Sequence, residues 1–418
     1  MVSGDRRQLG RDYVWNTAAS LMSSLSLVIM LTAVTRTAGI AAAGVYSLAI
    51  AVGQQFQTLG MYEVRTYHVT DVSGRYAFGN YLATRIVTTV LMIGGIVAAT
   101  MAGASPRDGL VSLLVAMLRI FDAVEDVFYS EFQRNGRLDI GGRACFWRIT
   151  TTTGVFVVTL VVTHDLMSAT ILTLVMSSIA FVLLYLPAAR RLFSVRPCWD
   201  FSRIWSLLVE CLPLFLGSFL AMYLTNAPRY AIEEFLDSQA QGVFAIIYMP
   251  AVAINMLSLF VFRPLLTPIA SRWVGGDRQG FARLVRRGLV TTSGAFVLVA
   301  LVSLVAGPWI LQLVFNQDVS AYLPELMILV AGGAFNAVAV ILYYALTTMR
   351  RQVLVFGGYA AAAVVVLVLS RLLVPIWALM GAALSYAGAM LVLALLFLLL
   401  SLHSARLAGA QTHATTRR

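Results

Sequence analysis

The chain has 418 residues, of which 60% are hydrophobic and 12% are charged. A soluble globular protein carries about 25% charged residues, so this composition excludes an ordinary soluble protein. All 30 basic residues are arginine, and the lack of lysine excludes both a Schiff-base lysine and the lysine of a Walker A phosphate loop.

Long apolar segments recur along the chain from Tyr13 to Leu402. Each is long enough to cross a bilayer, because about 20 helical residues cover a hydrocarbon core of roughly 30 Å. Their positions predict twelve membrane spans, at residues 12–35, 40–64, 79–102, 109–132, 143–163, 166–189, 204–228, 239–263, 285–307, 322–349, 352–374 and 377–402. The first follows a polar N-terminus without a clear cleavage site, which predicts that it is retained rather than removed as a signal peptide.

The two halves of the chain begin in a similar way. Arg36 precedes the segment Gly44–Ile50, and Arg229 precedes Gly242–Ile247. The likeness is weak, because the spacing from arginine to glycine is 8 residues in one half and 13 in the other, and chance likeness of apolar segments is the alternative. Many transporters are built from two such halves. We therefore predict an all-α integral membrane protein with two six-helix lobes around a central cavity, at residues 1–200 and 201–402, followed by a cytoplasmic tail at 403–418.

The distribution of arginine predicts the orientation in the membrane. With the N-terminus in the cytoplasm, 22 of the 30 arginines lie in cytoplasmic segments and 4 lie on the opposite side. This asymmetry agrees with the positive-inside rule, and it predicts that both termini are cytoplasmic. It also accounts for the net charge of +11 without a nucleic-acid partner. Contact between the basic loops and anionic lipids is a second interpretation of the same charge.

The predicted span at 109–132 carries charges, which cost at least a few kcal/mol at the centre of a bilayer. At 100° per residue its polar side chains fall within an arc of about 120° on one face of a helix. These side chains are Arg119, Asp122, Glu125, Asp126, Tyr129 and Gln133. Arg85 and Arg148, in the spans before and after it, lie at a similar depth and are the expected partners of the three acids.

Two interpretations of this charged set stay open. It is either an ion-pair network that holds three spans together, or a site that couples transport to a proton or sodium gradient. The second interpretation rests on the expected balance of three acids against two nearby bases, which leaves one carboxyl group that is neutralised at modest cost.

A second polar set lies in the first two spans of each predicted lobe. The candidates for substrate binding are Asn16, Arg36, Gln54, Gln57, Tyr223, Asn226 and Arg229. Arginine suits a phosphate ligand, because the guanidinium group offers paired donors to its oxygens. The alternative for Arg36 and Arg229 is that they anchor helix ends at the outer membrane interface.

The sequence contains no catalytic or metal-binding motif. The three cysteines are scattered, without a CxxC motif, and no Ser–His–Asp grouping occurs. We expect all four histidines to lie in loops or in the tail: His68, His164, His403 and His413. The sequence therefore predicts neither an enzyme nor a bound cofactor or metal.

Several segments resemble a known family in their order and spacing. They are Asn16…Arg36-x-x-Gly39…Gly44-Val45-Tyr46…Leu59-Gly60, the charged stretch from Asp122 to Asp139, Asn226–Ile232, Tyr322-x-Pro-Glu-Leu, Tyr344–Arg350 and Gly381-Ala-Ala. Together they resemble bacterial polysaccharide biosynthesis proteins, the flippases of O-antigen and capsule repeat units. Asp122 is a departure that keeps the charge, because the family would be expected to have glutamate there.

The resemblance implies a member of the multidrug/oligosaccharidyl-lipid/polysaccharide exporter superfamily, with twelve helices in two lobes around a cavity. Such a protein moves an undecaprenyl-diphosphate-linked oligosaccharide from the inner to the outer leaflet of the bacterial plasma membrane by alternating access. Its partners would be that lipid, the membrane lipids, and the glycosyltransferases and polymerase of the same pathway. The headgroup of this lipid cannot cross the bilayer unaided, because its sugars and diphosphate would lose their hydrogen bonds to water in hydrocarbon.

Two other functions compete with this one. An ion-coupled multidrug exporter of the same superfamily would use an acid-rich cavity to bind cations, whereas an arginine-rich cavity favours phosphate. A membrane-bound glycan polymerase would normally need a large extracytoplasmic loop, and no predicted loop is long enough to fold as a domain.

Overall fold

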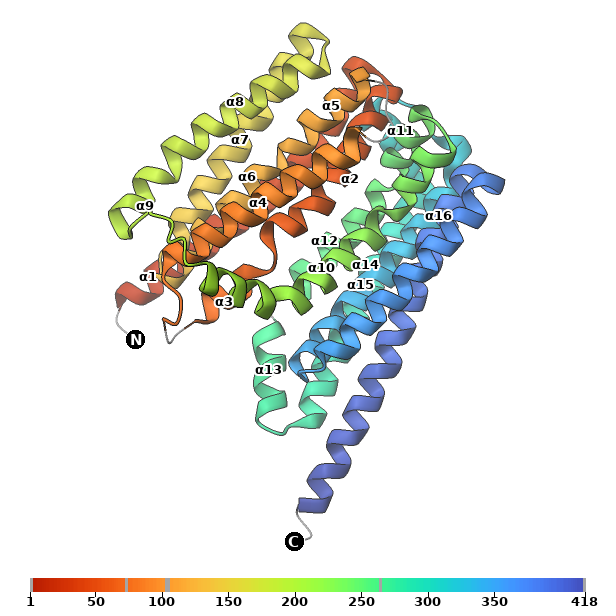
Figure 1. Ribbon diagram of the computed structural model, residues 1–418. Coiled ribbons are helices and arrows are strands. Elements are labelled where there is room, and N and C mark those ends of the chain that lie inside the picture. The colour runs from red at the N-terminus through yellow and green to blue at the C-terminus, as the bar shows by residue number, and fades with distance from the viewer. Residues whose placement is uncertain (1–2, 72–73, 102–105, 263–264, 416–418) are drawn as a thin grey trace. The chain divides into compact units, whose positions relative to one another are not determined.

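The computed structural model describes residues 3–71, 74–101, 106–262 and 265–415. These residues form helices joined by short connections, with no strand among them (Figure 1). Within the described ranges, nine helices are long and apolar enough to cross a membrane. The protein is thus an all-α, multi-pass membrane protein, as its composition predicts.

The chain divides into two compact units, Met1–Met222 and Tyr223–Arg418. In the first unit α7 packs against both α1 and α8, and α2 packs against α4 and α5 (Figure 1). The helices of this unit are α1 (Ser3–Ala38), α2 (Ile40–Met61), α3 (Val64–Thr70), α4 (Phe78–Met101), α5 (Pro106–Met117), α6 (Arg119–Arg134), α7 (Leu138–Thr163), α8 (Leu166–Leu184), α9 (Leu186–Leu192) and the first part of α10 (Phe201–Phe235).

In the second unit α15 packs against α12, α14 and α16. Beyond the remainder of α10, the helices of this unit are α11 (Ser238–Ile247), α12 (Met249–Phe262), α13 (Leu266–Val274), α14 (Arg278–Phe315), the short 3-10 helix η2 (Ser320–Tyr322), α15 (Leu323–Thr348) and α16 (Gln352–Thr415). The last helix therefore continues into the segment that the sequence predicts as a tail.

The boundary between the units lies inside α10, 22 residues after the predicted lobe boundary at residue 200. The reason is that the first part of α10 packs with the first unit. Leu207 and Cys211 belong to the hydrophobic core of that unit, and the Tyr67 hydroxyl donates a hydrogen bond to the backbone oxygen of Glu210 at 2.9 Å. The contacts of a helix, rather than the position of the preceding loop, decide to which unit it belongs.

Two predicted spans are each built from a pair of helices. The span at 109–132 is divided at Leu118 into α5 and α6, and the span at 239–263 is divided at Tyr248 into α11 and α12. Pro250 occupies the second position of α12, where the missing N–H of proline is tolerated because the first turn of a helix leaves its donors free. Pro250 is a signal in the sequence for the interruption of the span at 239–263, whereas the break before α6 has no such signal.

Helix α16 contains the last two predicted spans, 352–374 and 377–402. The two parts are separated by the non-helical backbone of Ala378, with φ 48° and ψ −126°, three residues after Pro375.

The predicted spans at 40–64 and 109–132 are not among the nine apolar helices counted above. The first is interrupted by glutamines and the second by charges, which is where the sequence places candidate functional residues.

Aspartates begin several helices. The carboxylate of Asp165 accepts the backbone N–H of Ser168 at the start of α8, and that of Asp277 accepts the N–H of Gly280 at the start of α14. Each bond satisfies a donor that the first turn of a helix leaves without a partner. Gly39, with φ 89°, makes the turn between α1 and α2, a conformation that glycine adopts without steric cost.

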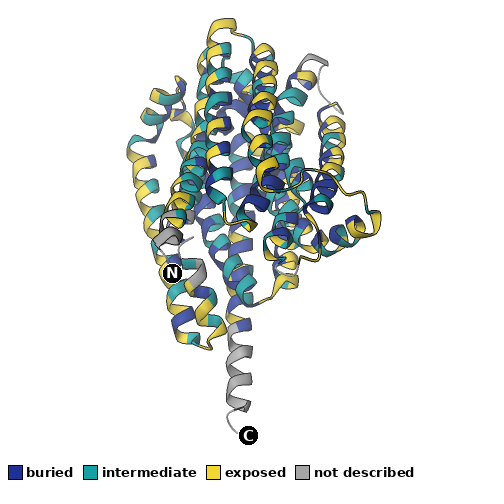
Figure 2. Ribbon diagram, turned by 90° about the vertical axis from the view of Figure 1, so that its left-hand side faces the viewer, coloured by how far each residue is buried: buried dark blue, intermediate teal, exposed yellow. Residues whose placement is uncertain are grey.

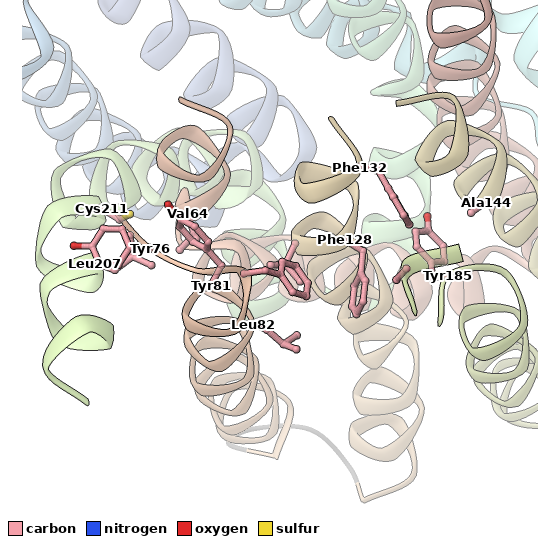
Figure 3. Close-up of a cluster of buried hydrophobic side chains, with 13 residues drawn as sticks. Val64, Tyr76, Tyr81, Leu82, Phe128, Phe132, Ala144, Tyr185, Leu207 and Cys211 are labelled. Atoms are coloured by element: carbon pink, nitrogen blue, oxygen red, sulfur yellow. The ribbon is translucent and has the colours of Figure 1, made fainter. Parts of the chain in front are cut away.

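The hydrophobic core of the first unit is aromatic, as Figure 3 shows. Phe128 of α6 lies between Tyr81 of α4 and Tyr185, which joins α8 to α9. Many outward side chains are apolar as well, among them Val305 and Ile376, and Figure 2 shows exposed segments along the helices. An apolar exterior suits a protein whose surroundings are lipid tails rather than water.

Candidate functional site

A buried ion pair joins α4 to α6 in the first unit. Arg85, which is 1% exposed, places one guanidinium nitrogen 2.6 Å from a carboxylate oxygen of Asp126. Its other terminal nitrogen donates to the backbone oxygen of Gly60 at the end of α2, and the Thr88 hydroxyl donates to the same oxygen at 2.7 Å. Three helices are therefore tied together at one point.

A second pair joins α7 to α6. The guanidinium of Arg148 lies 2.6 Å from a carboxylate oxygen of Asp122 and also forms an ion pair with Glu125. The other carboxylate oxygen of Glu125 accepts a hydrogen bond of 2.7 Å from the Tyr185 hydroxyl. Both Arg148 and Glu125 are buried, so this carboxylate receives donors from two sides within the protein interior.

Two further arginines supply cations to the same acids. Arg119 lies 3.0 Å from Asp122 on the same helix, and Arg65 of α3 lies 3.4 Å from Asp126. The expected shortage of bases is therefore wrong. Arg65 lies just beyond the predicted span at 40–64, yet α3 brings it back onto α6, so all three acids have arginine partners.

The remaining polar residues of α6 contact other helices of the unit. The hydroxyl of Tyr129 donates a hydrogen bond to the amide oxygen of Asn16 on α1, and Arg65 donates to Gln133 at 3.0 Å. Arg65 also covers the Tyr129 ring, with its guanidinium carbon 4.9 Å from the ring centre. The polar stripe of α6 is thus turned toward protein, and Asn16 belongs to this group of contacts.

His68 corrects another expectation. It does not lie in a loop but in α3, where it is fully buried, and its Nε2 is 2.5 Å from a carboxylate oxygen of Glu131. The imidazole stacks on the ring of Tyr81 with a centroid distance of 4.0 Å. The prediction failed because α3 has only seven residues, too few for an apolar period to reveal a helix.

The geometry of these charges favours a structural network. Buried ion pairs are seldom a large net source of stability, but removing one partner leaves an unpaired charge and is strongly destabilising. Arg85, Asp126, Arg148 and Glu125 are all buried and come from three helices. We therefore interpret the network as a device that fixes the packing of α4, α6 and α7.

The second unit contains a buried arginine in a different environment. Arg229 lies within α10, six residues before the end of the helix, and is 8% exposed. Its terminal nitrogen donates to the side-chain oxygen of Asn226 at 2.9 Å, and its guanidinium carbon lies 4.8 Å from the ring centre of Tyr248. These contacts hold Arg229 inside the unit, which argues against its alternative role as an anchor at the outer membrane interface.

In the described part of the chain, no carboxylate forms an ion pair with Arg229; the ionisable groups around it are tyrosines. Its Nε is buried without a hydrogen-bond partner among these residues. The Tyr248 hydroxyl continues the polar group through a bond of 3.2 Å to the hydroxyl of Tyr386 on α16. A buried guanidinium next to neutral donors is an environment that an anion would stabilise.

Amide side chains lie in the same unit. Asn336 of α15 donates to Asn255 of α12 at 3.2 Å. Tyr223 is half-buried on α10 and stacks on Tyr230 at a centroid distance of 6.2 Å. Of the predicted binding residues in the second half, the structure therefore brings Asn226 and Arg229 into direct contact and places Tyr223 on the same helix, three residues before Asn226.

The other predicted binding residues lie in the first unit. Arg36 is exposed in the last turn of α1, whereas Gln54 and Gln57 are half-buried on α2. Gln55, which the predicted set does not include, is buried and donates to the backbone oxygen of Phe219 at 3.1 Å. The binding role of Arg36, Gln54 and Gln57 stays a prediction.

Tyr185, Tyr248 and Tyr386 were not identified from the sequence. Tyr185 and Tyr248 lie at junctions between helices and contact Glu125 of α6 and Arg229 of α10, respectively. Tyr386 of α16 bonds Tyr248, so the role of each tyrosine depends on long-range packing. The signal in the sequence is only that each is a polar-tipped aromatic residue within an apolar segment. Such a residue usually finds a hydrogen-bond partner when it is buried.

The described residues contain no group of three or more histidine, cysteine, aspartate or glutamate side chains that could hold a metal ion. The three cysteines are free. No cofactor is therefore assigned to either polar group.

The chain is similar to known proteins over most of its length. No family model matches it. It is 18% identical over 377 residues to the capsular polysaccharide biosynthesis protein CapF of Staphylococcus aureus, covering 90% of this chain and 94% of that protein.

Two solved structures have the same architecture. One is the lipid II flippase MurJ in an inward closed conformation, with a TM-score of 0.70 and 14% identity, covering 95% of this chain and 92% of that one. The other is an inward-facing multidrug resistance MATE family transporter, with a TM-score of 0.66 and 12% identity, covering 94% and 96%. These likenesses agree with the resemblance identified in the sequence: the chain has the fold of the transporters of the MOP superfamily, that is, of the multidrug/oligosaccharidyl-lipid/polysaccharide exporters.

Proposed function

We propose that the protein is a flippase that moves a polyprenyl-diphosphate-linked oligosaccharide from the inner to the outer leaflet for cell-surface polysaccharide assembly. The observation that carries the proposal is Arg229, a buried arginine without a carboxylate partner in the described part of its unit. The protein binds and releases this lipid without making or breaking its bonds, so it is not an enzyme.

The chemistry of Arg229 fits a diphosphate. A guanidinium with a free Nε–H offers a donor to a phosphate oxygen, and charge-assisted hydrogen bonds of this kind are among the strong ones in proteins. Asn226 holds one terminal nitrogen in place, and Tyr248 covers the face of the group. The neutral Tyr248–Tyr386 pair adds hydroxyl groups that suit sugars.

The relatives support the same substrate class. CapF is named for capsular polysaccharide biosynthesis and aligns with 90% of this chain. MurJ, whose fold the chain shares, is named a flippase of a lipid. The arginine distribution adds the orientation that we propose, in the plasma membrane with both termini in the cytoplasm. The pathway's glycosyltransferases and polymerase are the proposed partners that supply and consume the substrate.

The remaining candidates take supporting roles in this proposal. Arg36, Gln54, Gln57 and Asn16, all of the first unit, and Tyr223 of the second unit remain further candidates for contact with the substrate. The ion-pair network of α6 keeps the first unit rigid, so we assign no coupling role to it.

An ion-coupled exporter of cationic drugs is the second function that the fold permits. It would use an acid to hold the cation, yet each of Asp122, Glu125 and Asp126 already has an arginine partner. A glycan polymerase would be supported by new glycosidic bonds made by the purified protein.

Deletion of the gene from its native cell, followed by complementation, tests the proposal. We expect loss of surface glycan and accumulation of its lipid-linked precursor inside the cell, with restoration by the wild-type chain. Arg229→Ala should restore neither, although the protein is inserted and abundant.

Arg371→Ala is the matched control, because Arg371 forms an exposed pair with Glu234 at 3.8 Å in the same unit. Such surface pairs contribute little to stability. Normal surface glycan in the deletion strain would refute the proposed function. Full restoration by Arg229→Ala would refute the role of Arg229.

A further inference from the structure

A groove on the first unit takes no part in either polar group. It has a volume of about 230 Å³ and lies between α7 and the α8–α9 pair. Arg143 and Trp147 line it from α7, and Leu183, Pro187 and Arg191 line it from the other side. These residues lie near the helix ends at which the chain changes from apolar to basic sequence, which is where a membrane meets water.

The groove is positively charged. Its lining contains Arg143 and Arg191 and no acidic side chain. Both arginines are exposed, and neither forms an ion pair with a carboxylate in the described ranges. Two guanidinium groups without a counter-charge favour an anionic ligand. The lack of a carboxylate disfavours a zwitterionic headgroup, because its ammonium group would have no acceptor of opposite charge.

An apolar ridge leads away from the groove along α8. Val175, Ile179 and Leu183 are spaced four residues apart, and all three are exposed. Pro187 and Arg191 continue the spacing onto α9, and the residue that joins the two helices has helical backbone angles. Side chains four residues apart form one ridge on a helix, so an acyl chain bound to the ridge ends beside the two arginines.

We propose that this groove binds an anionic phospholipid of the membrane. Arg143 and Arg191 hold the phosphodiester, Trp147 lies at the level of the glycerol backbone, and one acyl chain follows the ridge of α8. An arginine near a membrane surface attracts anionic lipids, and an exposed tryptophan prefers this interface. The inference does not depend on the transported substrate.

Quenching of Trp147 fluorescence tests the site. The wild-type protein and Trp147→Phe are reconstituted in phosphatidylcholine vesicles, and their difference isolates the signal of Trp147. Phosphatidylglycerol or phosphatidylcholine, each brominated near the headgroup end of an acyl chain, is then added in steps. We expect about a tenfold preference for phosphatidylglycerol, which corresponds to about 1.4 kcal/mol. High salt should weaken the preference for phosphatidylglycerol, because salt screens exposed charges.

Arg143→Ala/Arg191→Ala should abolish the preference without changing quenching by phosphatidylcholine. Arg190→Ala is the matched control, since Arg190 is exposed on the same short helix but does not line the groove. If the double variant does not fold, each single variant should lose about threefold of the preference.

Equal quenching by the two lipids in the wild type would overturn the proposal. So would an unchanged preference in the arginine variants. An equal loss in Arg190→Ala would show a general attraction of the basic surface instead of a site, which also contradicts it.

Discussion

A charged side chain buried among apolar helices is stable only if another group supplies what water no longer supplies. The two polar groups of this protein meet that need differently. The charge of Arg85 is paired within the chain with Asp126, and a backbone oxygen accepts a second hydrogen bond from its guanidinium group. Arg229 has Asn226 and aromatic faces but no carboxylate partner in the described unit. The charge of Arg85 is therefore neutralised within the chain, whereas we propose that the charge of Arg229 is neutralised by a bound anion.

The structural interpretation of the Arg85–Asp126 pair can be tested with a double variant. Arg85→Met leaves Asp126 with only the more distant Arg65, so we expect a loss of about 3–5 kcal/mol in the free energy of unfolding. Arg85→Met/Asp126→Leu should recover most of this loss, because neither charge of the pair is left without its partner. Thermal unfolding of the purified proteins measures both effects.

Transport by the double variant separates packing from coupling. We expect its transport to depend on ion gradients to the same extent as that of the wild type. A stable double variant that transports without this dependence would show that Asp126 is a coupling group.

The break within helix α16 leaves no space for a side chain at Gly381. At Gly381 an added Cβ would lie 2.2 Å from the backbone oxygen of Leu373, because the turn at Ala378 brings the two parts of α16 close together. This clash would persist, because the backbone of Leu373 cannot move aside as a flexible side chain can. The apolar segments of the sequence predict two spans here, but not this close approach.

Gly381→Ala should therefore destabilise the protein by at least about 1–3 kcal/mol, the typical cost of overpacking. Gly357→Ala in the same helix is the matched control, since nothing lies within 4 Å of the added Cβ. That change should be neutral or stabilising by up to about 1 kcal/mol, because alanine favours a helix more than glycine does. Similar thermal midpoints for the two variants would contradict the close approach seen at Gly381.

The start of α14 gives a pH-dependent prediction outside the spans. The backbone N–H of Gly280 and the guanidinium of Arg272 bind the carboxylate of Asp277 and lower its pKa below the usual value. The cap therefore stabilises the helix start above the ordinary carboxyl pKa and is lost as pH falls through the lowered pKa.

Hydrogen exchange of the segment containing Gly280 measures this cap. Asp277→Ala should exchange faster than the wild type at neutral pH, whereas Asp277→Asn, which keeps an acceptor oxygen, should show a smaller change. Each exchange rate is divided by that of the unfolded segment at the same pH. On this scale, acidification should speed the exchange of the wild-type segment and leave that of Asp277→Asn unchanged. Equal exchange in all three proteins would mean that Asp277 does not cap α14.

For the whole molecule, the sequence predicts the membrane class and the helical segments because burial in lipid imposes long apolar runs. The acids of α6 and the arginines of α4 and α7 could also be paired in advance, because helical spacing and depth restrict which charges meet. The contributions of Arg65, Tyr185 and Tyr248 could not be predicted. Each depends on how a short or broken helix packs back, which a local pattern does not contain.

The proposed orientation predicts the sides of two loops. Alkaline phosphatase fused after Arg196 should be inactive, because that loop is expected in the cytoplasm, and the enzyme fused after Asp237 should be active on the opposite side. A fluorescent protein fused at the same positions should give the reverse pattern. Activity at Arg196 and none at Asp237 would invert the topology.

The most direct test of the account is flipping by the purified protein in sealed vesicles. A fluorescent polyprenyl-diphosphate oligosaccharide placed in one leaflet should equilibrate between leaflets with the wild-type protein and not in protein-free vesicles. Arg229→Ala should slow equilibration about tenfold or more, as expected for the loss of a charge-assisted hydrogen bond, while Arg371→Ala should not. A wild-type rate equal to that of empty vesicles, or an Arg229→Ala rate equal to the wild type, would contradict the account.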